Sequence, residues 1–250
     1  MFIGTGTVVN ATTVLVGSGL GVLIGHRLPL RTRSVVTDAL GLVTLLIAAS
    51  SAFAVSDDAF SDAVGGSAPM LIVLGALLIG AIIGSLARIE DRLEGLGDVL
   101  QRRLSRGGTE DHAGRDRFIQ GFMTASLVFC VGPLTILGSI TEGIGEGSDQ
   151  LLLKSALDGF ASIAFAAAFG WGVAASVLTL VLIQGSLTAL GAALGDFLPE
   201  AHLAALTATG GLLLVGVALR LLEIKQLKVG DLLPALLIAP LLTELVIQLR

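Results

Sequence analysis

Phe118–Gly172 reads FIQGFMTASLVFCVGPLTILGSITEG (118–143), IGEGSDQLLLK (144–154) and SALDGFASIAFAAAFGWG (155–172). Its two apolar segments are interrupted by Gly132-Pro133 and accompanied by the acids Glu142, Glu146 and Asp158. Within a bilayer, helices broken at membrane depth with polar groups beside the break are a common way to build a solute site. The stretch therefore predicts a polytopic membrane protein in which these residues line a pathway.

The composition of the whole chain is that of a membrane protein. Of its 250 residues, 54% are hydrophobic and 14% are charged, and the mean hydropathy is +0.91. Soluble domains carry roughly 25% charged residues. The single cysteine, Cys130, excludes an intrachain disulfide and a multi-cysteine metal site. The net charge of −5 is small and the basic residues sit in short loops, which makes nucleic acid an unexpected partner.

Eight apolar segments predict an all-α bundle of about seven to eight spans in a single transmembrane domain, residues 1–250. They lie near residues 2–25, 34–55, 69–87, 118–139, 155–169, 173–194, 202–222 and 231–249. A crossing helix needs about 20 residues. The segment 155–169 is short by this measure, so the sequence leaves open whether it crosses or re-enters.

The longest polar segment, residues 88–117, separates the third and fourth apolar segments. In its first half Ile89, Leu93 and Leu96 recur at helical spacing with charges between them. This pattern predicts an amphipathic helix on the membrane surface. The second half, SRGGTEDHAGRDR (105–117), predicts a flexible loop.

Two of the predicted spans carry glycine at every fourth position. Gly17, Gly21 and Gly25 lie on one face of the first span, and Gly80 and Gly84 lie on one face of the third. Faces of small residues let a second helix backbone approach closely in lipid. These faces are predicted to be helix contacts.

Lysine and arginine orient the chain, because cytoplasmic loops carry an excess of both. Nearly all of them fall in 26–33, 88–117 and 220–230, whereas 56–68, 140–153 and 195–201 are acidic. Lys154, at the edge of the fifth span, is the exception. Eight spans with both termini outside match this pattern, and a re-entrant 155–169 would change it.

Three short internal echoes suggest a duplication. In the first, an offset of 193 residues aligns Gly17 with Gly210, Arg27 with Arg220 and Asp38 with Asp231. In the second, Gly132-Pro133-Leu134 resembles Ala239-Pro240-Leu241. In the third, Asp38-Ala39 resembles Asp158-Gly159. Transporter folds often contain such repeats. Low-complexity apolar sequence also produces such matches by chance, and both interpretations stay open.

Pro133 and Asp158 are the leading candidates for a solute or ion pathway. Pro133 clashes with the carbonyl four residues earlier, that of Phe129, and frees it to accept a hydrogen bond or coordinate a cation, with Thr135 close by. Asp158, followed by Ser162, lies within an apolar span, where acids are costly and commonly functional. The structural alternatives are a packing kink at Pro133 and an interfacial acid near a helix N-terminus at Asp158, where Lys154 could form an i,i+4 pair.

Further polar residues and one proline extend the predicted pathway. Asn10 and Gln184 lie inside spans and must find hydrogen-bond partners, as solute ligands or as contacts between helices. Pro240 predicts a second break, in the same span as Glu244, which lies deep in the last span or faces outer headgroups. Glu142 and Glu146 form an acidic outer vestibule or a solvated loop. Asp38 and Asp231 open spans, where helix capping explains them.

Enzyme signatures are absent from the sequence. It contains neither His-Glu-x-x-His nor Gly-x-Ser-x-Gly, and no Gly-x-x-x-x-Gly-Lys phosphate loop. His26, His112 and His202 are far apart in sequence and lack a ligand pattern around them. We expect no catalytic site, no cofactor and no metal centre.

Several local patterns resemble a known family. They are the opening run from Gly4-Thr5 to Asn10, VGPLTILGSITEG (131–143), LKSALDGFASIAFAAAFGWGV (153–173) and TGGLLLVGVALRLLEIKQLKVGDLLPAL (209–236). Over nearly its whole length the chain resembles the bacterial domain-of-unknown-function 554 family, the YqgA-like inner-membrane proteins. The resemblance implies a multi-span plasma-membrane protein, proposed to be a transporter without an established substrate.

Two functions of different kinds remain after these exclusions. The first is a secondary transporter or channel-like permease for a small solute or ion, with its pathway near Gly132-Pro133 and Asp158 and with H⁺ or a metal cation as coupling ion. The alternative is a membrane scaffold or regulator that docks a partner through 88–117. The expected surroundings are the lipid bilayer and, because small-residue faces are extensive, further copies of the chain in a homo-oligomer.

Overall fold

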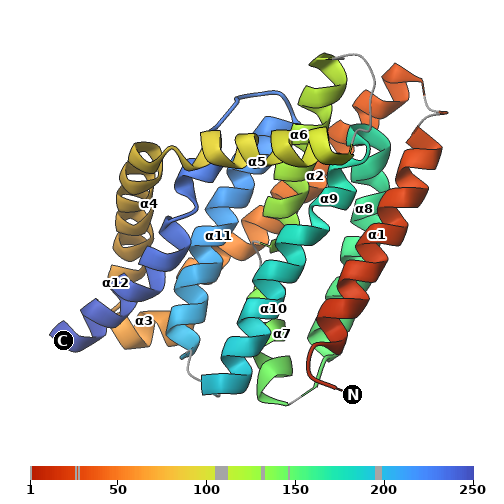
Figure 1. Ribbon diagram of the computed structural model, residues 1–250. Coiled ribbons are helices and arrows are strands. Elements are labelled where there is room, and N and C mark those ends of the chain that lie inside the picture. Colours follow the sequence, from red (N-terminus) through yellow and green to blue (C-terminus); the bar gives the residue numbers. More distant parts are fainter. Residues whose placement is uncertain are drawn as a thin grey trace. The chain divides into compact units, whose positions relative to one another are not determined.

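The computed structural model describes residues 2–25, 27, 29–104, 112–130, 133–145, 147–194 and 199–250. These residues form helices joined by turns, with no strand among them, as the sequence predicts (Figure 1). The helices are α1 (Thr5–Gly25), α2 (Leu30–Ala52), η1 (Phe53–Ser56), α3 (Asp58–Val64), α4 (Ala68–Ala87), α5 (Ile89–Leu104), α6 (His112–Cys130), α7 (Pro133–Ile144), α8 (Asp149–Phe169), α9 (Gly172–Ala175), α10 (Val177–Leu194), α11 (Glu200–Leu221), η2 (Val229–Leu232) and α12 (Ala235–Leu249). Gly132 and Glu146 of the predicted pathway lie outside the described residues.

The helices are long and apolar enough for a polytopic membrane protein. Seven of the described helical segments could cross a membrane by length and composition, and an eighth crossing results if α6 and α7 together form one bent span. The axes of Gly114–Cys130 and Leu134–Ile144 differ by 57°. Because Pro133 is the first residue of α7, the chain breaks where its missing amide hydrogen predicts.

The differences from the sequence-based expectation include two helix starts and one predicted break. α8 begins at Asp149 rather than near 155 and has 21 residues, a sufficient length for a crossing. The polar residues 112–117 start α6 instead of ending a loop, since apolarity marks the bilayer boundary and not the helix boundary. α12 continues through Pro240 as one helix, so the second break is wrong. Alanine precedes Pro240 whereas glycine precedes Pro133, and alanine is the stronger helix former by about 1 kcal/mol.

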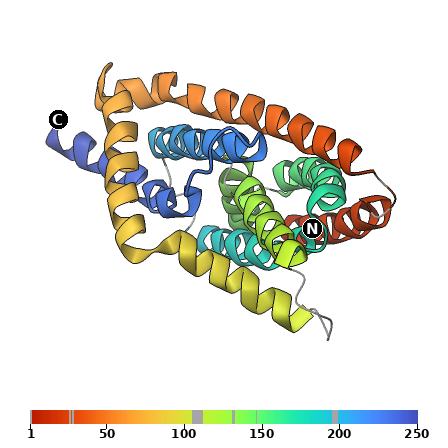
Figure 2. The same cartoon turned by 90° about the horizontal axis from the view of Figure 1, so that it is seen from above.

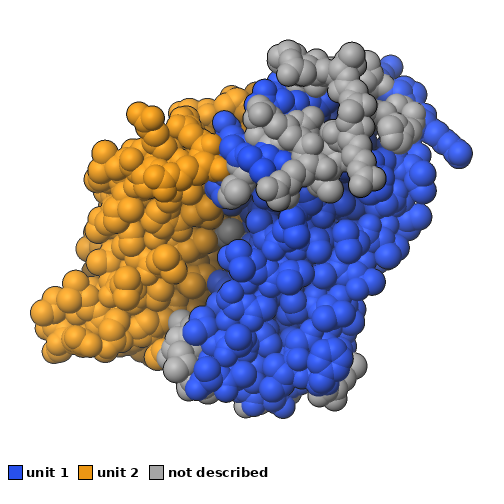
Figure 3. Space-filling model, viewed as in Figure 1, with its two compact units in different colours: residues 1–40, 93–197 blue, residues 41–92, 198–250 orange. Residues whose placement is uncertain are grey.

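The chain divides into two compact units, which are coloured separately in Figure 3. Unit 1 contains residues 1–40 and 93–197, and unit 2 contains residues 41–92 and 198–250. The division falls within α2 and within α5. Each unit is described by itself below.

In unit 1, α1 and α8 pack side by side and run in the same direction (Figures 1 and 2). The glycine face of α1 makes this approach possible: Gly6 lies against Leu151 near the start of α8, and Gly25 lies against Ala167 near its end. A methyl group on Gly25 would come 2.6 Å from the carbonyl oxygen of Ala167. The predicted role of this face as a helix contact is confirmed.

A second parallel pair in unit 1 joins the bent span to the following helices. Gly172, at the start of α9, lies against Phe118, and the hydroxyl of Thr179 in α10 donates to Ser126 Oγ at 2.7 Å. Further along, Gly191 lies against the carbonyl of Ile140 in α7. α9 and α10 therefore follow the course of α6 and α7 from one end to the other.

Unit 2 is built from antiparallel pairs. Gly80 and Gly84 of α4 lie against Ala235 and Asp231, which precede or begin α12, so the second predicted glycine face is also a helix contact. Its core consists mainly of alanine with a few larger side chains; it includes Phe60, Val64, Ile72, Val73, Ala76, Ala201, Ala204, Ala205, Ala208, Ala235 and Ala239. Small side chains let these helices approach closely.

Candidate functional site

Four helices of unit 1 each bury a stripe of polar side chains. The stripes are Thr7, Asn10 and Ser18 on α1; Thr135, Ser139 and Glu142 on α7; Lys154, Ser155, Asp158 and Ser162 on α8; and Gln184 and Thr188 on α10. Each of these residues is at most 7% exposed. Taken over the four stripes, most successive members are three or four residues apart, the spacing of residues on one face of a helix. We call this set the polar core.

The outward faces of the same helices are apolar. Leu15 and Leu20 on α1, Phe160 on α8 and Leu182 on α10 are all exposed. The four helices contact one another in the order α1, α8, α7, α10 and back to α1. A soluble helix buries its apolar face and exposes its polar one. The reversed pattern suits helices that have lipid outside and a polar interior.

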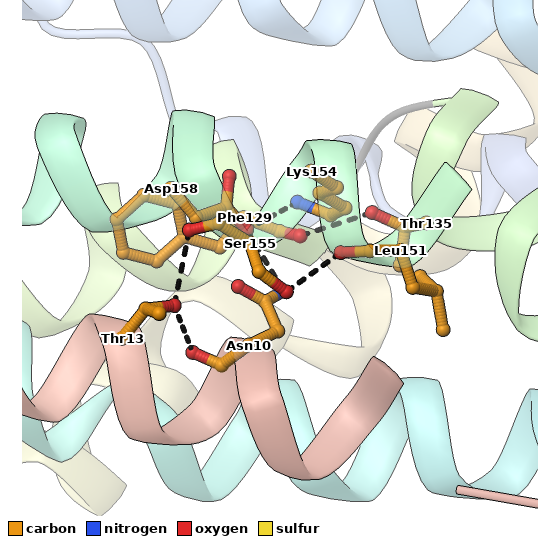
Figure 4. Close-up of polar contacts among 8 residues, drawn as sticks. All are labelled: Asn10, Thr13, Phe129, Thr135, Leu151, Lys154, Ser155 and Asp158. Carbon is orange, nitrogen blue, oxygen red and sulfur yellow. Dashed lines mark hydrogen bonds and ion pairs between the residues drawn. The ribbon is translucent and has the colours of Figure 1, made fainter. Parts of the chain in front are cut away.

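Asp158 of α8 links to α1 and to its own helix within the polar core (Figure 4). Its Oδ2 atom accepts a hydrogen bond from Asn10 Nδ2 at 3.0 Å and pairs with the ammonium of Lys154, one turn earlier on α8. Thr13 Oγ1 donates to the carbonyl of Ser155 at 3.0 Å and fixes α1 beside this group. Because α8 begins at Asp149, Asp158 is in the middle of the helix, and the interpretation as an acid at a helix N-terminus is wrong.

The break between α6 and α7 borders the polar core. Thr135 Oγ1 donates to the carbonyl of Phe129 at 3.0 Å, and Figure 4 draws this bond beside Lys154. Phe129 is the residue whose carbonyl Pro133 leaves without its helical donor, so the predicted free acceptor is satisfied by a hydroxyl of the next helix. The Phe129 ring meets Phe165 of α8 edge to face, with centroids 6.1 Å apart.

Glu142 is a buried carboxylate that sequence reasoning treated as a vestibule or loop residue. It is 2% exposed. Its Oε1 atom accepts hydrogen bonds from the Gly6 amide and from Ser148 Oγ, both at 2.6 Å. Gly6 belongs to the first turn of α1, where backbone N–H groups lack helical partners and favour an anion. The spacing Thr135, Ser139, Glu142 could have revealed this face, because it continues a polar stripe at helical intervals.

Many atoms of the polar core have no hydrogen-bond partner among the described residues. They are Thr7 Oγ1, Asn10 Oδ1, Ser18 Oγ, Ser139 Oγ, Glu142 Oε2, Thr188 Oγ1 and both amide atoms of Gln184. A buried polar atom without a partner costs about 1–3 kcal/mol. Native interiors satisfy most such atoms with protein or ordered water. This concentration marks a place where water or a polar ligand is expected.

The sequence-predicted residues divide between the two units. Asn10, Thr135, Asp158, Ser162 and Gln184 belong to the polar core, and Asn10 and Asp158 touch. Pro240 and Glu244 belong to unit 2.

In unit 2 the charged groups bond mainly to one another and to backbone. Glu244 Oε2 lies 3.1 Å from His202 Nε2. Glu90, 3% exposed, accepts hydrogen bonds from Arg220 at 2.7 Å and from the Gly230 amide at 2.6 Å. Asp231 accepts from the Glu90 amide at 2.9 Å and so caps the start of α5, not the span that it opens, for which the capping role was predicted. Asp38, in the part of α2 that belongs to unit 1, is exposed.

Comparison with known proteins identifies relatives along nearly the whole chain. Residues 5–244 match the family described as "Protein of unknown function (DUF554)". The Escherichia coli (strain K12) protein named "Uncharacterized protein YqgA" is 31% identical over 236 residues, which cover 94% of each chain. The Bacillus subtilis (strain 168) protein named "Uncharacterized membrane protein YdfK" is 28% identical over 235 residues, 94% of this chain and 93% of that protein. No solved structure matches.

Proposed function

The chain belongs to the DUF554 family of proteins of unknown function, and we propose that it is a secondary transporter or channel-like permease for a small solute or ion. It is a membrane-embedded helical protein, and the proposal concerns what passes through it. The observation that carries the proposal is the polar core of unit 1. A protein that served only as a membrane anchor would have no reason to bury so many unpartnered polar atoms among four contacting helices.

The ion pair of Lys154 and Asp158 is the proposed place where the pathway binds its solute or coupling ion. Both side chains are at most 10% exposed, and ionisable groups inside membrane segments are rare and commonly functional. Removal from water costs several kcal/mol per ion, which mutual attraction repays only partly. The Lys154–Asp158 ion pair therefore contributes little net stabilisation. A cationic solute or a proton could displace Lys154 from Asp158 at a small cost in free energy. This favours Asp158 as the coupling residue over Glu244, whose side chain is 49% exposed.

The bend between α6 and α7 supports the same proposal. Discontinuous helices in transporters present backbone groups to substrates and ions near the bilayer midplane. Here the carbonyl of Phe129 is held by the hydroxyl of Thr135, a bond that a solute could replace. The start of α7 at Pro133 would then be the point at which the pathway bends.

Reconstitution tests the proposal. Full-length protein in proteoliposomes with a trapped pH-sensitive dye would be given Na⁺, K⁺, small carboxylates, amino acids and polyols in turn, with and without a membrane potential. We expect at least one to produce flux above protein-free liposomes, and Asp158→Asn to reduce that flux at least tenfold. Asp149→Asn, an exposed carboxylate on the same helix, is the matched control. Fluxes equal to those of empty liposomes, together with Asp158→Asn and Pro133→Ala strains that behave as wild type, would contradict the proposal.

A scaffold or regulator is the second candidate function, and α5 favours it. α5 alternates charged and apolar residues and is held at its start by Glu90 and Asp231. Deletion separates the two functions. Because 112–117 belong to α6, the deletion should be confined to 105–111. A transporter should keep its flux without these residues, whereas a docking protein should lose its cellular phenotype.

We further propose that the protein resides in the bacterial plasma membrane with both termini outside and assembles as a homo-oligomer. The orientation rests on the basic loops 26–33, 88–117 and 220–230. A topology reporter fused after Arg250 tests it, and a cytoplasmic signal would contradict eight crossings. Light scattering of the detergent-solubilised protein tests the assembly.

A further inference from the structure

Only one of the two carboxylate oxygens of Glu142 accepts hydrogen bonds from described residues. Oε1 accepts from the Gly6 amide and from Ser148 Oγ. Oε2 is buried and has no hydrogen-bond partner among the residues that the structure describes. Oε1 therefore links α1 to the end of α7. Oε2 is left to bind a ligand.

Two residues next to the Gly6–Glu142 contact, one on the same face of α7 and one following Gly6 in α1, carry hydroxyl groups without a described partner. Ser139 precedes Glu142 by three residues, which places it on the same face of α7. Thr7 follows Gly6, whose amide contacts the carboxylate. Both hydroxyl oxygens are buried, with Ser139 0% and Thr7 6% exposed, and neither has a partner among the described residues. Three buried oxygen atoms without a described partner thus belong to the two helix segments that the Gly6–Glu142 hydrogen bond joins.

The charge balance indicates what these oxygens would bind. Lys154 is already paired with Asp158, and no described lysine, arginine or histidine forms an ion pair with Glu142. A buried, unpaired carboxylate is strongly unfavourable unless it is neutralised. One carboxylate requires one positive charge, and carboxylate and hydroxyl oxygens are the ligands of hard cations. The described residues hold no group of three or more His, Cys, Asp or Glu side chains, the kind of group that would suit a transition metal.

We infer that Glu142 Oε2, Ser139 Oγ and Thr7 Oγ1 bind an alkali cation, for which Na⁺ is the probe. The inference rests on the proposed function in one respect: the cation would be the ion that drives transport. Binding itself is measurable without transport. The cation would neutralise Glu142 and hold α1 against α7, so its release would loosen the end of unit 1.

Thermal unfolding of the purified full-length protein in detergent tests the inference. NaCl would be titrated against choline chloride at constant ionic strength. We expect Na⁺ to raise Tm saturably by at least about 2 °C, because a ligand that binds only the folded state stabilises it. Glu142→Gln keeps an acceptor for the Gly6 amide but removes the charge, and it should abolish the Na⁺-dependent shift. Asp149→Asn, an exposed carboxylate near the same turn, should retain it.

A ligand variant that keeps the charge makes the test independent of how well Glu142→Gln folds. Ser139→Ala should raise the half-saturating Na⁺ concentration about tenfold, the effect of losing one moderate interaction. Equal Tm values in NaCl and choline chloride, a shift that survives Glu142→Gln, or an unchanged midpoint in Ser139→Ala would each overturn the assignment. A Na⁺ shift without any flux would instead contradict the proposed transport and leave the cation site standing.

Discussion

Unit 1 and unit 2 differ in how far their buried polar groups find hydrogen-bond partners within the protein. In unit 2 the packed interior is alanine-rich, and Glu90, Arg220 and Asp231 bond to one another or to backbone where helices begin and end. In unit 1 the buried polar side chains lie along α1, α7, α8 and α10, and many of their atoms lack a partner among the described residues, whereas in unit 2 His202 Nδ1 and Arg220 Nε do. Both interiors form from the same kind of apolar helix, so hydrophobicity alone does not determine the difference. The unpartnered polar atoms of unit 1 are what the proposed pathway through this unit would require.

Lys154→Met should produce the largest effect on stability. It leaves Asp158 buried with Asn10 as its remaining described partner, and breaking a buried pair costs about 3–5 kcal/mol. The free energy of unfolding in detergent measures this. The double variant Lys154→Met/Asp158→Asn should recover part of the loss. The control is Lys228→Met in unit 2, whose pair with Asp91 is 66% and 53% exposed and is worth at most about 1 kcal/mol. If Lys154→Met and Lys228→Met lowered the free energy of unfolding equally, the buried pair of unit 1 would not differ from the exposed pair of unit 2.

Arg220→Ala should separate stability from transport. It removes the partner of buried Glu90 and should destabilise unit 2 by about 3 kcal/mol. Flux per folded molecule should not change, because Glu90, Arg220 and Asp231 hold helix ends together and do not belong to the polar core. Proteoliposome flux normalised to folded protein provides the measurement. A selective loss of flux in Arg220→Ala would place unit 2 in the pathway.

Gly17→Ala tests the close contact that closes one side of the polar core. A Cβ at Gly17 would lie 2.5 Å from the carbonyl oxygen of Gly159. Such overpacking costs about 1–3 kcal/mol. Gly19→Ala is the matched control on the same helix, because a Cβ there meets no atom within 4 Å. Its expected effect is a small gain in stability, and thermal unfolding of both variants should show opposite signs.

Thr135→Val should have the smallest effect on stability. It removes the hydrogen bond to the Phe129 carbonyl beside the break, at an expected cost of about 1 kcal/mol. Thr12→Val is the control, since its hydroxyl donates to Val8 on an exposed face. A solute that binds the Phe129 carbonyl would show altered affinity in Thr135→Val alone. Unchanged unfolding and unchanged solute affinity would remove the break from the pathway.

The fold was largely predictable because its determinants are local. Long apolar runs specify helices in a bilayer, Pro133 specifies the break through its missing N–H, and glycine spacing specifies the close helix contacts. The predicted helix boundaries were wrong where polar residues are helical, because the predictions took the apolar segments as the helix limits. The polar turns at 112–117 and before 155 are helical, and Pro240 lies inside an unbroken helix.

The candidate site was only partly predictable because burial depends on partners distant in sequence. Asn10 and Asp158 were recognisable as polar residues in apolar segments, and the i,i+4 spacing of Lys154 and Asp158 anticipated their contact. The contact between Asn10 and Asp158 joins residues far apart in the chain. The prediction for Glu142 was wrong because α7 continues to Ile144 and α1, distant in sequence, covers its carboxylate.

The central claim is that the interior of unit 1 is accessible to water and the interior of unit 2 is not. Cysteine labelling tests it directly, since Cys130 is the only cysteine and can be replaced by serine. Ser18→Cys in unit 1 and Ala205→Cys in unit 2 occupy positions that are both 0% exposed, so burial is matched. In intact membranes, a small membrane-impermeant thiol reagent should modify Ser18→Cys at a measurable rate and leave Ala205→Cys unmodified. Equal resistance of both positions, in every condition that supports flux, would contradict a polar pathway through unit 1.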